Sequence, residues 1–227
     1  MSIRGMVRDE VKGLWGGGKG ISLVSIAIAW GLLIGLRMVY PVVIPYLQDD
    51  FNLNLTISGL LVTVLWFFGS VGQLPSGVLA DRYPERRLMA ISILSVSIAI
   101  IFVITAPSSH ILFLATAVWG IGHSLYPIAR ITFLSNLYST RLGSALGVTM
   151  ATGDIGQTVL PPIAAVLASA FVWQIGLGFV VPFLVGSGIV MLILSRKQVI
   201  QQKSTDLQSI RDTLKVVSEL RKPEIGF

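Results

Sequence analysis

The sequence predicts an all-α membrane protein with six transmembrane helices. Three observations predict this fold class: 53% of the 227 residues are hydrophobic, only 12% are charged, and the apolar residues gather in six long runs. A soluble domain carries about 25% charged residues, which it needs to cover its surface with polar groups. The composition therefore excludes an ordinary soluble domain, and the lack of cysteine excludes disulfides and thiolate metal sites.

Each of the six runs is long enough to cross a bilayer as a helix. A spanning helix needs about 20 mostly apolar residues, and it satisfies its backbone hydrogen bonds within the segment, as lipid requires. The runs do not alternate between polar and apolar residues, which argues against a β-barrel. The first run contains Arg37 and is too long for the core of a cleaved signal peptide. The predicted spans are residues 21–46, 57–80, 88–106, 111–134, 143–168 and 174–194.

The positions of the 17 lysine and arginine residues predict the orientation of the chain. All but two lie before the first span, between the second and third, between the fourth and fifth, or after the sixth. Because cytoplasmic loops are enriched in lysine and arginine, we predict a multi-pass protein of the plasma membrane with both termini in the cytoplasm. The net charge of +6 is then a signal of topology, and no nucleic-acid partner is expected.

The turn between the second and third spans reads GVLADRYPERR, residues 77–87. It resembles the signature G-x-L-A-D-R-x-G-R-R-R that the major facilitator superfamily carries at this place, although Pro84 and Glu85 depart from that pattern. Residues 138–147, YSTRLGSALG, are similar to the turn into span five of the same family. The resemblance implies a major-facilitator half-domain, since these transporters usually have twelve spans in two halves.

The same turn is expected to act as a conformational latch at the cytoplasmic face. The resemblance implies this role for Gly77, Asp81, Arg82, Arg86 and Arg87. Gly77 is expected to let two helices approach closely, and Asp81 needs a partner because an acid is unfavourable at a helix C-terminus. The alternative is a capped turn whose arginines serve only the topology.

Arg37 lies past the middle of the first span. Intramembrane arginines usually face a cavity or a partner, so Arg37 either binds an anion in a central pathway or pairs with Asp154 or with Asp49 and Asp50. The stretch RMVYPVVIPYL, which includes Tyr40, resembles span one of organophosphate/phosphate exchangers of the same superfamily. We therefore include Arg37 and Tyr40 among the predicted substrate-binding residues.

Span four carries His123, Tyr126 and Arg130 on one stripe, at i, i+3 and i+7. These residues are predicted to line the pathway, with the alternative that Arg130 snorkels to the cytoplasmic surface. Asp154 is the acid lying well inside a span, and it is predicted to bind a proton or cation, or to neutralise Arg37. Small residues near Asp154 are expected to mark close helix packing: Gly143, Gly147, Gly153 and Gly156.

The chain divides by composition into a cytoplasmic N-terminal segment, a transmembrane domain and a basic amphipathic tail or linker. These are residues 1–20, 21–195 and 196–227. No second charged turn is present, so the chain holds no internal repeat of such a half. The resemblance to transporters with twelve spans therefore implies a second six-span half as partner, either a C-terminal half or another copy.

The predicted function is secondary active transport of a small organic or inorganic anion by alternating access. No phosphate-binding loop is present, and no enzymatic activity, cofactor or metal is expected; the partners are the substrate and the bilayer. The alternatives are a carrier of a hydrophobic drug or sugar, and a non-transporting membrane module of half size.

Overall fold

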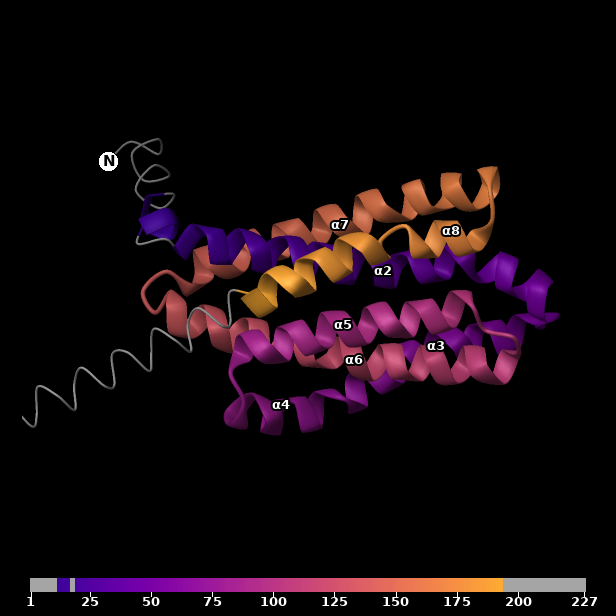
Figure 1. Cartoon of the computed structure of the whole chain (residues 1–227), viewed down its shortest axis with the longest axis horizontal. Helices are drawn as coiled ribbons and strands as arrows, with labels where there is room; N and C mark the ends of the chain where they lie inside the picture. Colours follow the sequence, from indigo (N-terminus) through magenta and orange to yellow (C-terminus); the bar gives the residue numbers. More distant parts are fainter. Residues whose placement is uncertain (1–11, 17–18, 194–227) are drawn as a thin grey trace, which may run out of the picture. The chain divides into compact units, whose positions relative to one another are not determined.

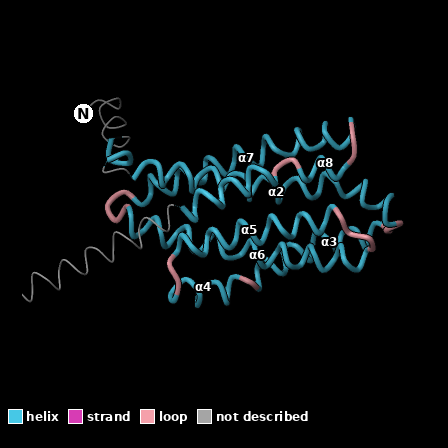
Figure 2. Tube along the Cα trace, viewed as in Figure 1, coloured by secondary structure: helices cyan, strands magenta, loops and turns pink. Residues whose placement is uncertain are grey.

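A computed structural model describes residues 12–16 and 19–193 of the chain. Every regular element in these residues is a helix, as predicted (Figures 1 and 2). The chain divides into two units, Met1–Leu192 and Ile193–Phe227. The predicted tail of residues 196–227 lies outside the described residues.

The helices follow the six apolar runs closely. They are α2 (Lys19–Phe51), α3 (Leu55–Val71), α4 (Gln73–Arg82), α5 (Glu85–Ile104), α6 (Ser109–Leu137), α7 (Leu142–Ala170) and α8 (Trp173–Gly178), and helical residues 181–193 continue the span that begins with α8.

The second predicted span is divided into α3 and α4 instead of forming one uninterrupted helix. Gly72 keeps a helical backbone and its N–H donates to the Phe68 carbonyl over 2.9 Å. Pro75 follows three residues later and has no N–H to donate to the preceding turn, which interrupts the helical hydrogen bonding. Together α3 and α4 still form one membrane-capable stretch, Leu55–Arg82.

The connections between helices lie alternately at two ends of the transmembrane unit. Figure 1 shows the α4–α5 and α6–α7 connections at the end where residues 12–16 lie, and the α2–α3, α5–α6 and α7–α8 connections at the other end. The lysines and arginines at the ends of the described helices all belong to the first end: Lys12, Lys19, Arg82, Arg86, Arg87 and Arg141. The charged turn is therefore at the same end as the N-terminal residues.

Five helical stretches of the described chain are long and apolar enough to cross a membrane. The remaining long helix is α7, which has 29 residues but carries Asp154, Gln157 and several glycines and threonines. It packs along most of α2, and Figure 1 shows the two lying side by side. Its lower hydropathy reflects polar residues within a helix of full spanning length.

Helices α2 and α7 meet at glycines. A Cβ on Gly156 would lie only 2.0 Å from the Gly31 carbonyl oxygen, so neither position has room for a side chain. Gly153 is also tightly packed, as predicted, because a Cβ there would lie 2.7 Å from Trp30 Nε1. The same prediction is wrong for Gly143 and Gly147, where a Cβ would meet nothing within 4 Å; both lie in the first turns of α7, before its close contact with α2.

Candidate functional site

The predicted residues of span four gather around Trp30 of α2. The Tyr126 ring stacks on the indole, with centroids 6.0 Å apart and planes 13° from parallel. The Arg130 guanidinium carbon lies 3.9 Å from the centroid of the same indole, and the His123 ring lies 6.3 Å away. The expected stripe on α6 therefore meets one tryptophan of α2, which the sequence reasoning had not selected.

This cluster is buried and only partly hydrogen-bonded. Arg130 is 3% exposed, and its Nη1 donates to Thr149 Oγ1 of α7 over 2.9 Å. The Tyr126 hydroxyl donates to the Ile26 carbonyl over 2.8 Å. Arg130 Nε and His123 Nε2 are buried without a hydrogen-bond partner. In this conformation Arg130 points into the helix bundle, whereas a snorkelling arginine would extend to water.

Arg37 lies on a second tryptophan, which belongs to α3. Its guanidinium carbon is 3.4 Å from the centroid of the Trp66 ring. The side chain is half-buried, and its Nε is buried without a hydrogen-bond partner. Within the part of the chain that the structure describes, Arg37 forms no ion pair. The pairing with an acid that was considered for Arg37 is therefore absent here.

Arg37 and Trp30 lie on the same side of α2, seven residues or about two helical turns apart. At a rise of about 1.5 Å per residue, the two arginine–tryptophan contacts are roughly 10 Å apart along the axis. The face of α2 that meets α3 and α6 thus carries two guanidinium groups on aromatic rings.

Tyr40 occupies the apolar interior close to this face. It is fully buried, and its hydroxyl pairs with Thr116 Oγ1 over 2.7 Å. Its ring meets Trp119 edge-on, with centroids 5.0 Å apart. Trp119 Nε1 is itself buried without a hydrogen-bond partner. Tyr40 therefore connects α2 to α6 in this conformation.

Asp154 is exposed on α7 and turned away from the cluster. Its Oδ1 accepts a hydrogen bond from Gln157 Nε2 over 2.8 Å. The preceding Gly153 faces Trp30, so Asp154 itself projects from a neighbouring side of the helix. At the end of α2, Asp50 accepts a hydrogen bond from the Trp173 indole. Two of the acids considered as partners for Arg37, Asp154 and Asp50, thus have other contacts.

The predicted latch residues separate into exposed and buried members. Asp81, Arg82 and Arg87 are exposed. Arg86 is 7% exposed; its Nη2 donates to Ser22 Oγ of α2 over 2.9 Å, and its guanidinium lies over the Phe133 ring at 4.6 Å. The buried arginine of the turn therefore joins α5 to α2 and α6.

The close helix approach expected at Gly77 is wrong for this conformation. A Cβ on Gly77 would meet nothing within 4 Å. The approach to α6 occurs earlier, at Gly72, where a Cβ would lie 2.5 Å from Ser124 Oγ. Ser76 pairs with the same Ser124 hydroxyl over 3.0 Å. The contact precedes the exposed end of α4, so Gly77 lies beyond the region where the helices touch.

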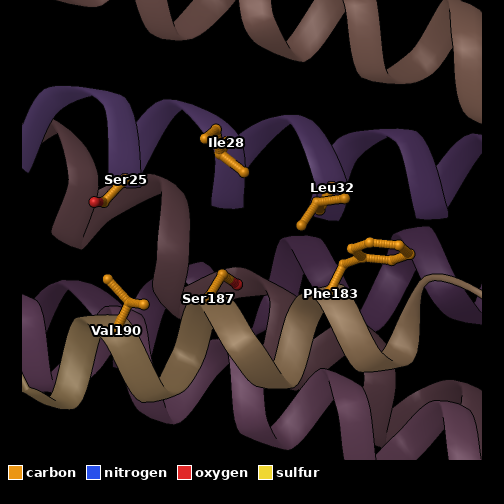
Figure 3. A pocket seen from close by; sticks show the side chains of 6 residues that line it. All are labelled: Ser25, Ile28, Leu32, Phe183, Ser187 and Val190. Atoms are coloured by element: carbon orange, nitrogen blue, oxygen red, sulfur yellow. The ribbon is translucent and has the colours of Figure 1, made fainter. Parts of the chain in front are cut away.

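A groove of about 250 Å³ lies between α2 and the helix that follows α8 (Figure 3). The figure shows Ser25, Ile28 and Leu32 facing Phe183, Ser187 and Val190 across it. Both serine hydroxyls donate to carbonyls of their own helices, Ile21 and Leu184. The groove is therefore apolar, and none of the predicted binding residues lines it.

Trp30, Trp66 and Thr149 are the contacts that sequence reasoning missed. A tryptophan in an apolar span usually belongs to the core or to the lipid interface. Each arginine contacts a tryptophan on a different helix, so spacing along one helix does not identify the pair. The available signal was general: an intramembrane arginine without an acid needs another partner, and aromatic faces bind guanidinium groups.

The family model of the Major Facilitator Superfamily matches residues 18–225. The match covers nearly the whole chain and agrees with its helical architecture, its alternating connections and its charged turn. The protein is therefore a multi-pass membrane protein that belongs to the Major Facilitator Superfamily.

Similar proteins include transporters of a neutral sugar and of an acidic sugar. The chain is 32% identical to a glucose/galactose transporter of Brucella abortus over 157 residues, which cover 64% of this chain and 36% of that protein. It is 24% identical to the hexuronate transporter of Bacillus subtilis over 151 residues, covering 66% and 35%. The chain thus spans about a third of the length of the curated relatives it matches.

The crystal structure of tetrameric PepTSo2 has a similar fold. The TM-score is 0.63 at 17% sequence identity, and the similarity covers 87% of this chain and 48% of that chain. At this identity the likeness shows the fold alone.

Proposed function

We propose that this chain forms the anion-binding half of a secondary transporter that moves a small organic or inorganic anion by alternating access. The observation that carries the proposal is the pair Arg37 and Arg130, whose guanidinium groups lie on tryptophan rings at membrane depth without an acidic partner among the described residues. The similarity to a hexuronate transporter supports an anionic substrate.

Arg37 and Arg130 have no negatively charged partner among the described residues. A charged side chain in the membrane interior is expensive unless it is paired or reaches water. Contact with a tryptophan face stabilises a cation by roughly 0.5–2 kcal/mol. This offsets only part of the free-energy cost of desolvating an arginine. Guanidinium groups match carboxylate and phosphate geometry, so an anion entering between the two arginines would supply the counter-charge.

A neutral sugar is the second candidate substrate. The 32% identity to a glucose/galactose transporter favours it. The half-exposed ring of Trp66, at 44% exposure, also offers an apolar face on which a pyranose can lie. In that case the arginines would donate hydrogen bonds to hydroxyl groups without neutralising a charge.

A second six-helix half is proposed as the partner that completes the pathway. The curated relatives are almost three times as long as the stretch they share with this chain. Trp66 and Asp154 are exposed in the half alone, and polar or charged groups within a span usually face protein or a water-filled cavity. The basic end of the unit is proposed to face the cytoplasm at the plasma membrane.

Uptake into proteoliposomes by the full-length protein tests the anion proposal. We expect wild-type uptake of radiolabelled glucuronate, a hexuronate, to exceed uptake of galactose. Arg37→Gln should reduce glucuronate uptake at least tenfold, because a lost charge-assisted hydrogen bond is worth about 1.5–3 kcal/mol. Lys12→Gln, which removes an exposed positive charge outside the spans, should transport normally.

Two outcomes contradict the proposal. Galactose uptake without glucuronate uptake would favour the neutral sugar. Normal glucuronate uptake by Arg37→Gln would make Arg37 structural and would remove it from the anion-binding site. Equal expression and a monodisperse gel-filtration profile of every variant show that folding is not the cause.

A further inference from the structure

Arg37 lies in a slot on α3 that is formed by the ring of Trp66 and by Gly69, which has no side chain. The Trp66 ring centroid lies 3.4 Å from the guanidinium carbon. A Cβ on Gly69 would lie 3.3 Å from Arg37 Nη2, so the lack of a side chain there leaves room for the guanidinium. Residues three apart on a helix share a face, so one side of α3 contacts the guanidinium at both places.

The stacked geometry leaves the hydrogen-bonding edge of the guanidinium available. An arginine that stacks on an aromatic ring uses the flat face of the group, whereas its five N–H donors lie in the plane. Arg37 Nε is buried without a hydrogen-bond partner, and its two Nη groups form no hydrogen bond or ion pair among the described residues, so the Nη groups are the donors left to meet an anion. Trp66 therefore holds Arg37 without occupying the donors that an anion would need.

We infer that Trp66 and Gly69 are positioning residues that hold the Arg37 guanidinium with its N–H edge presented to the substrate anion. This inference rests on the proposed function, because it names how that site is prepared before the anion arrives. A guanidinium held in one orientation loses less conformational freedom when it binds, so the slot raises affinity for a carboxylate. Trp66 acts through Arg37 and does not itself need to touch the anion.

The stack is tested first without any anion, by intrinsic fluorescence of the purified full-length protein. In the wild-type background, Arg37→Gln should change the tryptophan emission. In a Trp66→Phe background the same substitution should leave the emission unaltered, because the indole that contacts Arg37 is gone. Equal changes in both backgrounds would overturn the contact.

The positioning role is tested by concentration-dependent glucuronate uptake. Trp66→Leu removes the aromatic face and should raise KM about tenfold while Vmax changes less than about twofold, consistent with the usual size of a cation–π contact. Trp66→Phe keeps an aromatic face and should restore most of the affinity. Gly69→Ala displaces the guanidinium by a few tenths of an ångström and should also raise KM. A purely structural defect would lower Vmax and would not be rescued by phenylalanine.

Phe67→Leu is the matched control. Phe67 is the next residue of α3, is 59% exposed and packs edge-on against Phe68, so its loss should leave KM unchanged. If the wild type takes up glucuronate and Trp66→Leu does so with an unaltered KM, this inference is overturned and the proposed function stands. A wild type that takes up no glucuronate would overturn the proposed function and this inference with it, even where the fluorescence cycle shows the stack.

Discussion

Arg37 and Arg130 both lie on tryptophan rings, but their surroundings differ. Arg130 is almost fully buried and bridges three helices, since it extends from α6, lies on Trp30 of α2 and donates to Thr149 of α7. Arg37 is half-buried, and its guanidinium contacts the Trp66 ring and lies close to Gly69. Arg37 is thus the better placed of the two to meet a solute, while Arg130 also holds helices together.

The structural part of the Arg130 role predicts a stability change. Thr149→Val keeps the shape of the side chain but removes the hydroxyl that accepts from Arg130. A buried donor left without its acceptor costs about 1–3 kcal/mol, and about 1 kcal/mol shifts Tm by about 2–4 °C in a domain of this size. Thermal unfolding in detergent micelles should therefore show a Tm lower by several degrees.

Thr158→Val is the control for that measurement. Thr158 is exposed on the same helix, and among the described residues its hydroxyl donates only to the Asp154 carbonyl, over 2.7 Å. The Tm of the Thr158→Val variant should equal that of the wild type. If Thr149→Val unfolds at the same temperature as Thr158→Val, the bond to Arg130 does not stabilise the bundle.

At the scale of the elements, α2 has two different faces. The face toward α7 has glycines at the points of contact, so the two backbones come close. The face toward α3 and α6 carries Arg37 and Tyr40, and Trp30 lies at its border, in contact with α6 and close to Gly153 of α7. Close packing without large side chains is how membrane helices associate, because lipid gives them little hydrophobic driving force. The position of the arginines thus depends on the tight contact behind them.

Gly156→Ala tests the importance of this contact. The added Cβ would lie 2.0 Å from the Gly31 carbonyl oxygen, so α2 and α7 would have to separate. We expect a clear loss of thermal stability and of monodisperse protein. Gly147→Ala, on the same helix with nothing within 4 Å, should be neutral or slightly stabilising, because alanine has the higher helix propensity by about 1 kcal/mol. Equal stability of the two variants would refute the tight-contact argument.

For the whole molecule, hydropathy and charge predicted the helices and which connections share an end. These features follow from the bilayer, which imposes length, hydrogen bonding and charge asymmetry on each segment separately. The partners of Arg37 and Arg130 were beyond that reasoning, since Trp66 and Thr149 come from other helices. The division between α3 and α4 and the open positions of Gly77, Gly143 and Gly147 likewise depend on how helices cross.

Asp81, the exposed acid of the charged turn, is predicted to affect the balance of conformations in the proposed complete transporter. Asp81 is exposed at the end of α4 and has no hydrogen bond or ion pair among the described residues, so we propose that its partner lies across the interface with the second half. Asp81→Asn should then shift the populations of inward- and outward-open states while leaving substrate affinity nearly unchanged. Distances between a spin label at Ser139 and one at the facing end of the second half would measure this. Asp49→Asn makes the same chemical change near the C-terminal end of α2, at the other end of the transmembrane unit from Asp81. It should leave the distribution as it is in the wild type. An unchanged distribution in Asp81→Asn would leave the turn with its topological role alone.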